Sequence, residues 1–544
     1  MRRSSVLIAL ALLVGPATFD PSVSAAPPSE ADLLAGAAAR GDVAFRAAFE
    51  GADALRGWEG GERRARLVPG FQKSQSLLID RPAREGAGQQ TVRAALPLDK
   101  VRGTRVLVEV MARAEDVARP PHAYNGIKCT LHTVAPAGPR WSQQDNLFGT
   151  FDWRPLRFAA EVPADATEAW LVLGLEETTG RVWFDDLKVS VVGLRRRVPE
   201  RRPAGPVARG HDLPRLRGAM ISPNVTAEDL RVLGRQWQAN HVRWQLLWGG
   251  FPHGPADKGD LAAYDDWLES ALKRLDELLP VCREAGLLVL IDLHTPPGGR
   301  NGASECRLFH EKRFQDVFLR AWEKIARRYK GDATVWGYDL LNEPVEGVVA
   351  DGLLDWHALA TRAAKAVRAI DLDHALVVEP APWGNPEALD WFEPLDVPGV
   401  VYSVHMYLPH KFTHQGVHGG ATGINYPGRM DGRQVGKEQL RESLRPAIDY
   451  GRDYNVAIYL GEFSAIRWAP GPSAYHYLRD VIDIFEEQGW DWAYHAFREW
   501  DGWSVEHGPD PKDHTPSRTQ TDREKLLRSW FAKNSKPGAG RATK

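Results

Sequence analysis

Two glutamates, Glu343 and Glu462, follow apolar runs and carry the side chain that acid–base chemistry requires. Glu343 stands in Asn342-Glu343-Pro344, directly after the run from 335 to 341. Two facing carboxyl groups, one protonated and one ionised, can donate a proton to a leaving oxygen and attack the carbon that it leaves. The alternative is that Pro344 only ends a strand and that Glu343 lies in solvent. The surrounding residues must distinguish these two interpretations.

Other polar residues stand where further apolar runs end. If the runs are parallel strands of one barrel, their carboxyl ends gather at one face. Each residue also has an ordinary structural explanation, because a histidine at a strand end is more often structural than catalytic. The joint pattern favours a site, and its members beside the two glutamates are Arg243, His294, Asn342, His405 and Tyr407.

The expected neighbours suggest a role for each glutamate. Arg243 would hold Glu462 ionised by charge and hydrogen bonding, and Tyr407 could donate a further hydrogen bond to it. Glu343 has no such partner and lies beside His405, so it is the better acid/base. Asn342 can bind a sugar 2-hydroxyl. These roles predict glycoside hydrolysis.

Alternating strands and amphipathic helices must position these residues. The helical spacing is clearest in 264–282 and 314–329. Eight alternations predict a (β/α)8 TIM barrel over 211–535, and no Gly-x-Gly-x-x-Gly turn follows the first strand to suggest a dinucleotide. The expected strands are 216–221, 240–245, 287–293, 335–341, 375–379, 400–406, 457–461 and 490–497.

The N-terminal part has a different pattern, with short strands separated by turn residues. Such a pattern over 40–193 predicts an all-β jelly-roll sandwich. Residues 194–210 are rich in Arg and Pro and predict a linker. The expected strands include 105–111, 153–162, 169–175 and 182–191.

The first 25 residues resemble a secretory signal. Arg2 and Arg3 precede an apolar run from 6 to 14, and small residues lead to a cleavage site before Ala26. The run is shorter than the roughly 20 residues of a membrane span. We therefore expect a secreted or periplasmic protein without a membrane anchor. The paired arginines permit twin-arginine export as well as the general route.

Composition narrows the partners. The 544 residues contain 69 Lys and Arg against 71 Asp and Glu, which argues against nucleic acid or an anionic membrane as partner. Twenty tryptophans suit a neutral, amphipathic ligand such as a sugar, although many must be core residues. Three cysteines exclude a disulfide scaffold, and Cys282 is expected to be buried on a helix rather than bridged to Cys306. We expect a monomer.

Five segments in order are similar to the successive motifs of glycoside hydrolase family 5, the cellulase family of clan A. The resemblance implies a retaining enzyme that needs no cofactor, with Glu343 as acid/base and Glu462 as nucleophile. It also implies supporting roles for Arg243, His294 and Asn342, and for His405 and Tyr407. The segments are Asn240-His241-Val242-Arg243, Ile291-Asp292-Leu293-His294, Leu341-Asn342-Glu343-Pro344, Val404-His405-Met406-Tyr407 and Leu460-Gly461-Glu462-Phe463.

The last strand departs from that family. Its end usually carries a sugar-stacking tryptophan, whereas Trp492-Ala493-Tyr494-His495 places a histidine there. Trp500 or Trp503 would then supply the stacking surface. The departure affects the expected shape of the subsite more than the chemistry.

The N-terminal part resembles jelly-roll carbohydrate-binding modules, through 180–189 at its end and Phe49-Glu50 at its start. That resemblance implies a structural calcium site, with Glu50, Asp185 and Asp186 as ligands. The alternative is that these acids are ordinary turn residues. Trp141, Phe148 and Trp153 are candidates for sugar stacking or for the core.

Together these features predict a secreted retaining β-glycoside hydrolase that cleaves β-1,4-glucan by double displacement. Another β-glycan, above all mannan, is the main alternative substrate. A catalytically silent carbohydrate-binding protein is a second alternative. A metal-dependent hydrolase with His294, His405 and Glu462 as ligands is a third, although no His-x-His or His-Glu-x-x-His spacing supports it.

Overall fold

The structure is a computed structural model that describes residues 42–136, 138–194, 211–249, 254–302, 304–347, 349–350, 352–417 and 420–535. The predicted signal at 1–25 and positions 195–210 of the predicted linker lie outside these residues. The chain divides into two compact units between residues 195 and 196.

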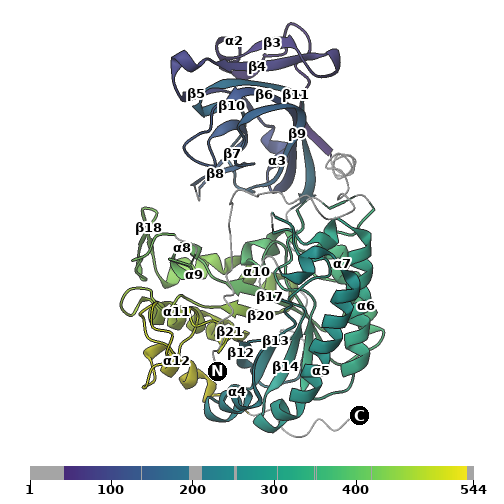
Figure 1. The fold of residues 1–544 in the computed structure, drawn as a ribbon, viewed down its shortest axis with the longest axis vertical. Helices are drawn as coiled ribbons and strands as arrows, with labels where there is room; N and C mark the ends of the chain where they lie inside the picture. The colour runs from purple at the N-terminus through teal and green to yellow at the C-terminus, as the bar shows by residue number, and fades with distance from the viewer. Residues whose placement is uncertain are drawn as a thin grey trace. The chain divides into compact units, whose positions relative to one another are not determined.

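The N-terminal unit is a sandwich of two antiparallel sheets, drawn in purple and blue in Figure 1. The first sheet has the order β3-β4-β11-β6-β9, with β1 paired to β11, and the second has the order β2-β5-β10-β7-β8. The first comprises β1 (Asp42–Ala47), β3 (Arg66–Pro69), β4 (Gln75–Arg81), β6 (Thr104–Val117), β9 (Gly149–Val162) and β11 (Gly180–Leu194). The second comprises β2 (Trp58–Glu59), β5 (Gly88–Ala95), β7 (Gly126–Ala135), β8 (Gly138–Gln143) and β10 (Glu168–Thr178). Two one-turn helices, α2 (Gly61–Arg64) and α3 (Leu98–Val101), lie between strands.

The period-two pattern of the strands builds the sandwich core. In β10, Leu171, Leu173 and Leu175 are fully buried and belong to one apolar cluster with residues of both sheets. Trp170 alternates with them on the opposite face and is partly exposed. Strand side chains point alternately to the two faces of a sheet, so the apolar alternation alone fixes which face is the core. The predicted sandwich is confirmed.

The C-terminal unit is a closed barrel of parallel strands surrounded by helices, drawn from teal to yellow in Figure 1. The strands follow one another around the barrel in chain order. The predicted (β/α)8 barrel is therefore confirmed. The strands are β12 (Arg217–Ile221), β13 (His241–Gln245), β14 (Leu288–Asp292), β15 (Val335–Asp339), β16 (Ala375–Val378), β17 (Val400–Met406), β20 (Ala457–Phe463) and β21 (Asp491–Phe497).

The helices bury the apolar stripes that their spacing predicts. In α5, Asp260 caps the first turn, Gly286 ends the helix with a φ of 73°, and the predicted apolar positions from Tyr264 to Cys282 are buried. The small antiparallel hairpin β18 (Gly428–Met430) and β19 (Arg433–Val435) lies in the long insertion after β17. The helices are α4 (Ala227–Arg231), α5 (Leu261–Ala285), α6 (Lys312–Tyr329), α7 (Trp356–Arg368), α8 (His410–Thr413), α9 (Lys437–Ser443), α10 (Arg445–Tyr454), α11 (Ser473–Gln488) and α12 (Asp522–Phe531).

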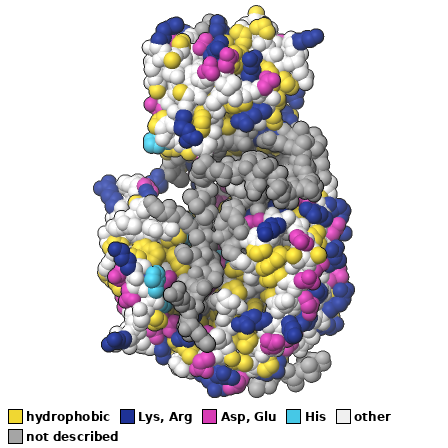
Figure 2. All heavy atoms as spheres, viewed as in Figure 1, with side chains coloured by type: hydrophobic (Ala, Val, Ile, Leu, Met, Phe, Trp, Pro, Cys, Tyr) yellow, Lys and Arg dark blue, Asp and Glu magenta, His cyan; other side chains and the backbone are white. Residues whose placement is uncertain are grey.

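Surface and cysteine features agree with the composition. On the face shown in Figure 2, basic and acidic side chains are interleaved on both units. Among the described residues, no helix is both long and apolar enough to span a bilayer. The three cysteines are free and buried, so Cys282 and Cys306 do not form a bridge.

Candidate active site

Glu343 lies just beyond the carboxyl end of β15, in a backbone conformation that glutamate rarely adopts. Its φ is 46°, in the left-handed region. Two buried side chains hold this turn. The Arg300 guanidinium donates to the Glu343 carbonyl at 2.9 Å, and the Glu343 amide donates to Glu379 Oε2 at 2.8 Å. Strained backbone of this kind is found where the surrounding structure fixes it, often at functional sites.

Glu462 lies within β20, and its side chain is 1 % exposed. Arg243 Nη1 donates to Glu462 Oε1 at 2.7 Å, and the Tyr407 hydroxyl donates to Oε2 at 2.9 Å. These are the two contacts that the sequence predicted for Glu462. Gly461 is required beside it, because a β-carbon there would lie 2.9 Å from His405 Nε2 and 2.6 Å from Ser403 Oγ.

The two glutamates face each other across the barrel mouth with His405 between them. One carboxylate oxygen of each and one nitrogen of His405 all lie within 4.8 Å of one another. His405 Nδ1 is 2.9 Å from Glu343 Oε1 and 3.7 Å from Glu462 Oε2, and its Nε2 is 3.1 Å from Glu379 Oε1. All four side chains are buried, so water screens these contacts little.

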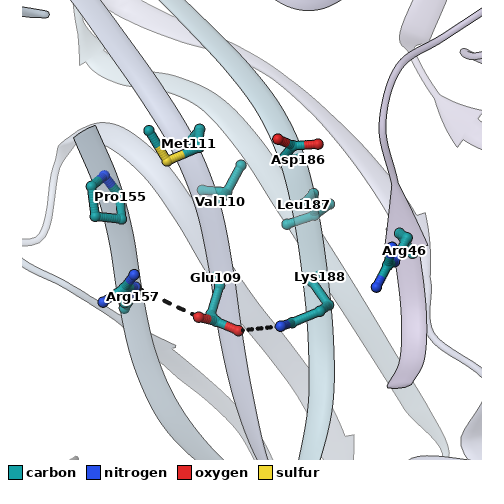
Figure 3. Close-up of a pocket in the computed structure, with 9 residues that line it drawn as sticks. All are labelled: Arg46, Glu109, Val110, Met111, Pro155, Arg157, Asp186, Leu187 and Lys188. Atoms are coloured by element: carbon teal, nitrogen blue, oxygen red, sulfur yellow. Dashed lines mark ion pairs between the residues drawn. The ribbon is translucent and has the colours of Figure 1, made fainter. Parts of the chain in front are cut away.

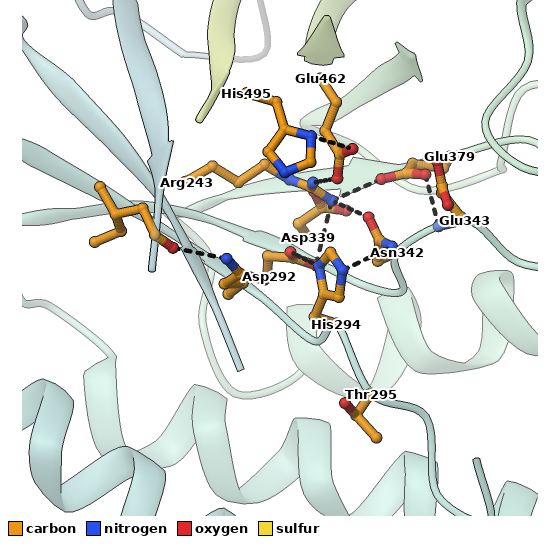
Figure 4. A network of polar contacts seen from close by, with 12 residues as sticks. Arg243, Asp292, His294, Thr295, Asp339, Asn342, Glu343, Glu379, Glu462 and His495 are labelled. Carbon is orange, nitrogen blue, oxygen red and sulfur yellow. Dashed lines mark hydrogen bonds and ion pairs between the residues drawn. The ribbon is translucent and has the colours of Figure 1, made fainter. Parts of the chain in front are cut away.

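Arg243 joins the glutamates to a larger buried network, shown in Figure 4. Besides Glu462, its guanidinium contacts Asp339 at 2.9 Å, Glu379 at 2.8 Å and Asp292 at 3.3 Å. Burial, together with the neighbouring carboxylates, raises the pKa of Asp339 well above its usual value despite the charge of Arg243. Asp339 therefore binds a proton more readily than an ordinary aspartate does. A buried cation with several carboxylates is costly to disrupt, because removing one partner leaves the others uncompensated.

The network sets the charges of Glu462 and His405. Burial alone raises the pKa of Glu462, but the positive charges of His405, His495 and Arg243 lower it well below its usual value. Burial lowers the pKa of His405, whereas the carboxylates of Glu379 and Glu462 raise it well above its usual value. Glu462 is thus held ionised and His405 is held protonated.

Asn342 and His294 form one side of the site. Asn342 Oδ1 accepts from Arg243 Nη2 at 3.0 Å, and its amide nitrogen lies 3.2 Å from His294 Nε2. Asp292 fixes the histidine, because Asp292 Oδ2 lies 2.8 Å from His294 Nδ1. The two residues are thus held in place next to Glu343.

His495 lies at the carboxyl end of β21 with its ring toward Glu462. His495 Nδ1 is 3.3 Å from Glu462 Oε2 and also contacts the Tyr407 hydroxyl. Trp503 is buried and packs against Tyr407, with ring centroids 5.8 Å apart. Trp500 is only partly buried and meets Trp503 edge to face, so it is the more accessible of the two predicted stacking residues.

The three residues of the metal-dependent alternative do not form one group in the structure. The structure groups His405 and Glu462 with Glu343, whereas His294 is paired with Asp292. His405 contacts carboxylates through both ring nitrogens, Nδ1 with Glu343 at 2.9 Å and Nε2 with Glu379 at 3.1 Å. The arrangement favours acid–base chemistry over metal ligation.

In the sandwich, two of the three calcium candidates flank one loop. Glu50 Oε1 accepts from the Gln75 amide at 2.8 Å, and Asp185 Oδ2 accepts from Ser74 Oγ at 2.6 Å. Asp185 is buried, and burial raises its pKa. Asp186 lies elsewhere, in a pocket of about 360 Å³ beside Lys188 and Met111 (Figure 3). Glu50 and Asp185 thus contact two adjacent residues of one loop, Gln75 and Ser74, whereas Asp186 lines the pocket.

The three aromatic candidates of the sandwich differ in exposure. Trp141 is 60 % exposed, and its ring stacks on His132 with centroids 3.7 Å apart. Phe148 packs against the edge of the core beneath Arg119, and Trp153 is partly buried against Phe71. Only Trp141 presents an open ring face among these three.

Several site residues were not recognised from the sequence. Asp292, Asp339 and Glu379 all stand at or next to the carboxyl ends of expected strands, which was the available signal. Arg300 and Glu499 come from loops, where no local pattern marks them. Their positions depend on contacts between segments that are distant in the sequence.

Comparison with known proteins shows which family the chain belongs to. Endoglucanase C of Acetivibrio thermocellus is 27 % identical over 248 residues, covering 41 % of this chain and 71 % of that protein. Cellodextrinase A of Ruminococcus flavefaciens is 27 % identical over 230 residues, covering 41 % and 66 %. The solved structure of Thermotoga maritima Cel5A with cellobiose has a TM-score of 0.45 and 23 % identity, covering 60 % of this chain and 99 % of that one. Residues 207–500 match the cellulase family, so the chain belongs to glycosyl hydrolase family 5.

Proposed function

We propose that this protein is a retaining β-glucan hydrolase in which Glu462 is the nucleophile and Glu343 the acid/base. The observation that carries the proposal is the position of the two carboxyl groups, whose facing oxygens lie within 4.8 Å. Retaining enzymes place their carboxyl groups at about 5–5.5 Å, whereas inverting enzymes leave about 6.5–9.5 Å for a water molecule. The short separation supports double displacement.

Each step assigns a task to the residues described. In the first step, Glu462 attacks the anomeric carbon while Glu343 gives its proton to the departing glycosidic oxygen. In the second step, Glu343 takes a proton from water, the water oxygen bonds to the anomeric carbon, and the bond to Glu462 breaks. Arg243 and Tyr407 stabilise the carboxylate that is used and regenerated. Asn342 is positioned to bind the sugar 2-hydroxyl.

The stereochemistry of the first product tests this mechanism. Hydrolysis of a β-1,4-cello-oligosaccharide followed by proton NMR should show the β-anomer first, with the α-anomer appearing only by mutarotation. Initial α-anomer would contradict double displacement. The absence of product from wild-type protein on every glycan tried would instead favour the catalytically silent carbohydrate-binding protein.

β-1,4-Glucan is the substrate we propose, and β-mannan is the alternative. The two relatives described above are named as an endoglucanase and a cellodextrinase, which supports glucan. The sugars differ in the orientation of the 2-hydroxyl, the group that Asn342 is proposed to bind. Rates on matched cello- and manno-oligosaccharides would decide, and a higher kcat/KM on the manno series would overturn the glucan assignment.

We also propose that the sandwich binds polysaccharide through the outer face of β7 and β8. Trp141 and His132 are opposite each other on these strands and stack in parallel, and His132 is also opposite Trp170 on β10. Arg93 covers the Trp170 ring at 4.2 Å. One face of the Trp141 ring is covered by His132, and the exposed part of this flat ring suits the face of a sugar ring.

Retention of the full chain on insoluble β-glucan tests this binding. Trp141→Ala should weaken retention, whereas Leu372→Ala, at an exposed apolar residue of the barrel, should not change it. Equal retention of the Trp141 variant and the wild type would show that this face does not bind the polysaccharide.

Two further parts of the proposal concern the export of the protein and calcium binding in the sandwich. We propose that residues 1–25 direct secretion, which N-terminal sequencing of the exported protein would test.

Calcium would bind between Glu50 and Asp185. Among the described residues, Asp185 has no ion pair with a basic side chain, and a buried carboxylate without one is suited to a cation. A chelator should lower the melting temperature of the sandwich while leaving the activity of the barrel unchanged.

A further inference from the structure

His495 differs from the residue that the family resemblance predicts, and the difference changes the charge beside Glu462. An indole would offer a flat face at this position, whereas the imidazole offers two nitrogen atoms. Its side chain is 4 % exposed, so these nitrogens must find their partners within the protein. The structure supplies an acid on each side.

The two acids are Glu462 and Glu499. His495 Nδ1 lies 3.3 Å from Glu462 Oε2, and Nε2 lies 3.2 Å from Glu499 Oε2. Glu499 is itself 3 % exposed, and among the described residues His495 is the only basic group in ion-pair contact with it. A buried carboxylate is stable only when it is paired, so Glu499 depends on a positive charge on His495.

The ring therefore carries a positive charge at neutral pH. Burial lowers the pKa of His495, but the carboxylates of Glu462 and Glu499 raise it to about 10. Three cationic side chains then surround Glu462, namely Arg243, His405 and His495. The groups that face His495 are Glu462 from β20, Tyr407 after β17, and Glu499 and the Trp503 ring after β21.

We infer that His495 and Glu499 are positioning residues. They hold a positive charge beside Glu462, and this charge makes the Glu462 carboxylate a better leaving group in the second displacement. The inference rests on the proposed function, because it requires Glu462 to be the nucleophile. When water attacks the anomeric carbon, the electron pair of the breaking bond returns to the Glu462 carboxylate. His495 transfers no proton in this step and only stabilises the charge that forms.

The His495–Glu499 pair has opposite effects on the rates of the two displacements. A carboxylate held by three cations is a weaker nucleophile, so the charge of His495 slows the first displacement. The same charge accelerates departure of that carboxylate in the second. Removing it should therefore slow turnover most where hydrolysis of the glycosyl-enzyme limits the rate, which is the case for aryl cellobiosides with good leaving groups.

Glu499→Gln is the most direct test, because it preserves shape, leaves Glu462 in place and removes one of the two carboxylate charges that raise the pKa of His495. With 2,4-dinitrophenyl β-cellobioside we expect kcat to fall roughly tenfold, with a larger burst of dinitrophenol before the steady state. The His495 imidazole, followed by nitrogen NMR, should lose its proton at a lower pH than in the wild type. A matched control is Glu506→Gln, which removes a nearby acid paired with Arg498 outside the site and should behave as wild type.

His495→Gln is the second variant, and it should move the acid limb of the kcat/KM profile to higher pH because Glu462 loses one cation. A thermal melt of each variant checks that the barrel is folded. The inference is overturned if folded Glu499→Gln keeps the wild-type burst and the wild-type His495 titration. The wild type can give the β-anomer first and a covalent label on Glu462 while the burst and the His495 titration do not change in the variants. In that case this inference fails and the proposed function stands.

Discussion

Arg243 Nη1 lies 2.7 Å from Glu462 Oε1, in a barrel interior where both side chains are buried. The same guanidinium contacts Asp339 and Glu379 at 2.9 and 2.8 Å. One cation thus fixes the proposed nucleophile and also reaches Glu379, which holds the backbone of Glu343. The two halves of the mechanism share a single buried support.

Arg243→Lys should therefore impair both activity and stability. Lysine keeps the charge but cannot reproduce the planar set of donors that reaches several carboxylates. We expect kcat/KM to fall at least about 100-fold, and unfolding to become easier by about 1.5–3 kcal/mol for each hydrogen bond to a carboxylate that is lost. Steady-state kinetics and denaturant unfolding measure the two effects. A variant with wild-type kcat/KM would contradict the central place of Arg243.

Glu343→Ala should separate substrates by their leaving groups. Without the proton donor, hydrolysis of unactivated glucan should fall by roughly 10²- to 10⁴-fold. An aryl glycoside with a good leaving group needs little protonation, so its first step should be nearly unaffected. Added azide should then restore turnover and give a β-glycosyl azide. Equal losses on both substrates, with no azide product, would argue against the acid/base role.

Glu379→Gln should slow catalysis although Glu379 is not a proposed reactant. Its carboxylate accepts from the Glu343 amide and lies 3.1 Å from His405 Nε2. Each hydrogen bond to a charged group contributes about 1.5–3 kcal/mol, so kcat should fall roughly 10- to 100-fold. Glu277→Gln, on the exposed face of α5, is the matched control. Identical kinetics of the two variants would contradict a role of Glu379 in catalysis.

His241 should make the stability of the barrel depend on pH. Burial lowers the pKa of His241 to about 3, whereas in an unfolded chain it is about 6.5. Between these values the unfolded chain binds a proton that the folded barrel does not, so stability falls as pH falls from 6.5 toward 3, by about 1.4 kcal/mol per pH unit. His241→Phe should remove this part of the slope in denaturant unfolding at several pH values. An unchanged slope would contradict the contribution of His241 to the pH dependence of stability.

The barrel strands could be predicted closely because their apolar runs are buried on both faces. The predicted strand 335–341 contains β15, although the ladder ends at Asp339 and Leu340 and Leu341 continue as buried chain. The glutamates could be predicted because a barrel brings strand ends together. The expectation that Arg243 and Tyr407 contact Glu462 followed from the same rule.

The remaining site residues depend on contacts that no local pattern encodes. A carboxylate at a strand end is ambiguous, so Glu379 could not be distinguished from a residue that only ends β16. Arg300 and Glu499 are brought in by loops, and a residue type in a loop does not say which atom it will reach. The His495 departure was visible in the sequence, but its partner Glu499 was not.

Trapping of the covalent intermediate tests the central claim most directly. Incubation of the wild type with a 2-deoxy-2-fluoro-β-cellobioside that carries a good leaving group should stop turnover, because the fluorine slows the second step more than the first. Proteolysis and mass spectrometry should then find one cellobiosyl group on the peptide that contains Glu462. A label on another carboxylate, or inactivation without any label, would contradict Glu462 as the nucleophile of a retaining hydrolase.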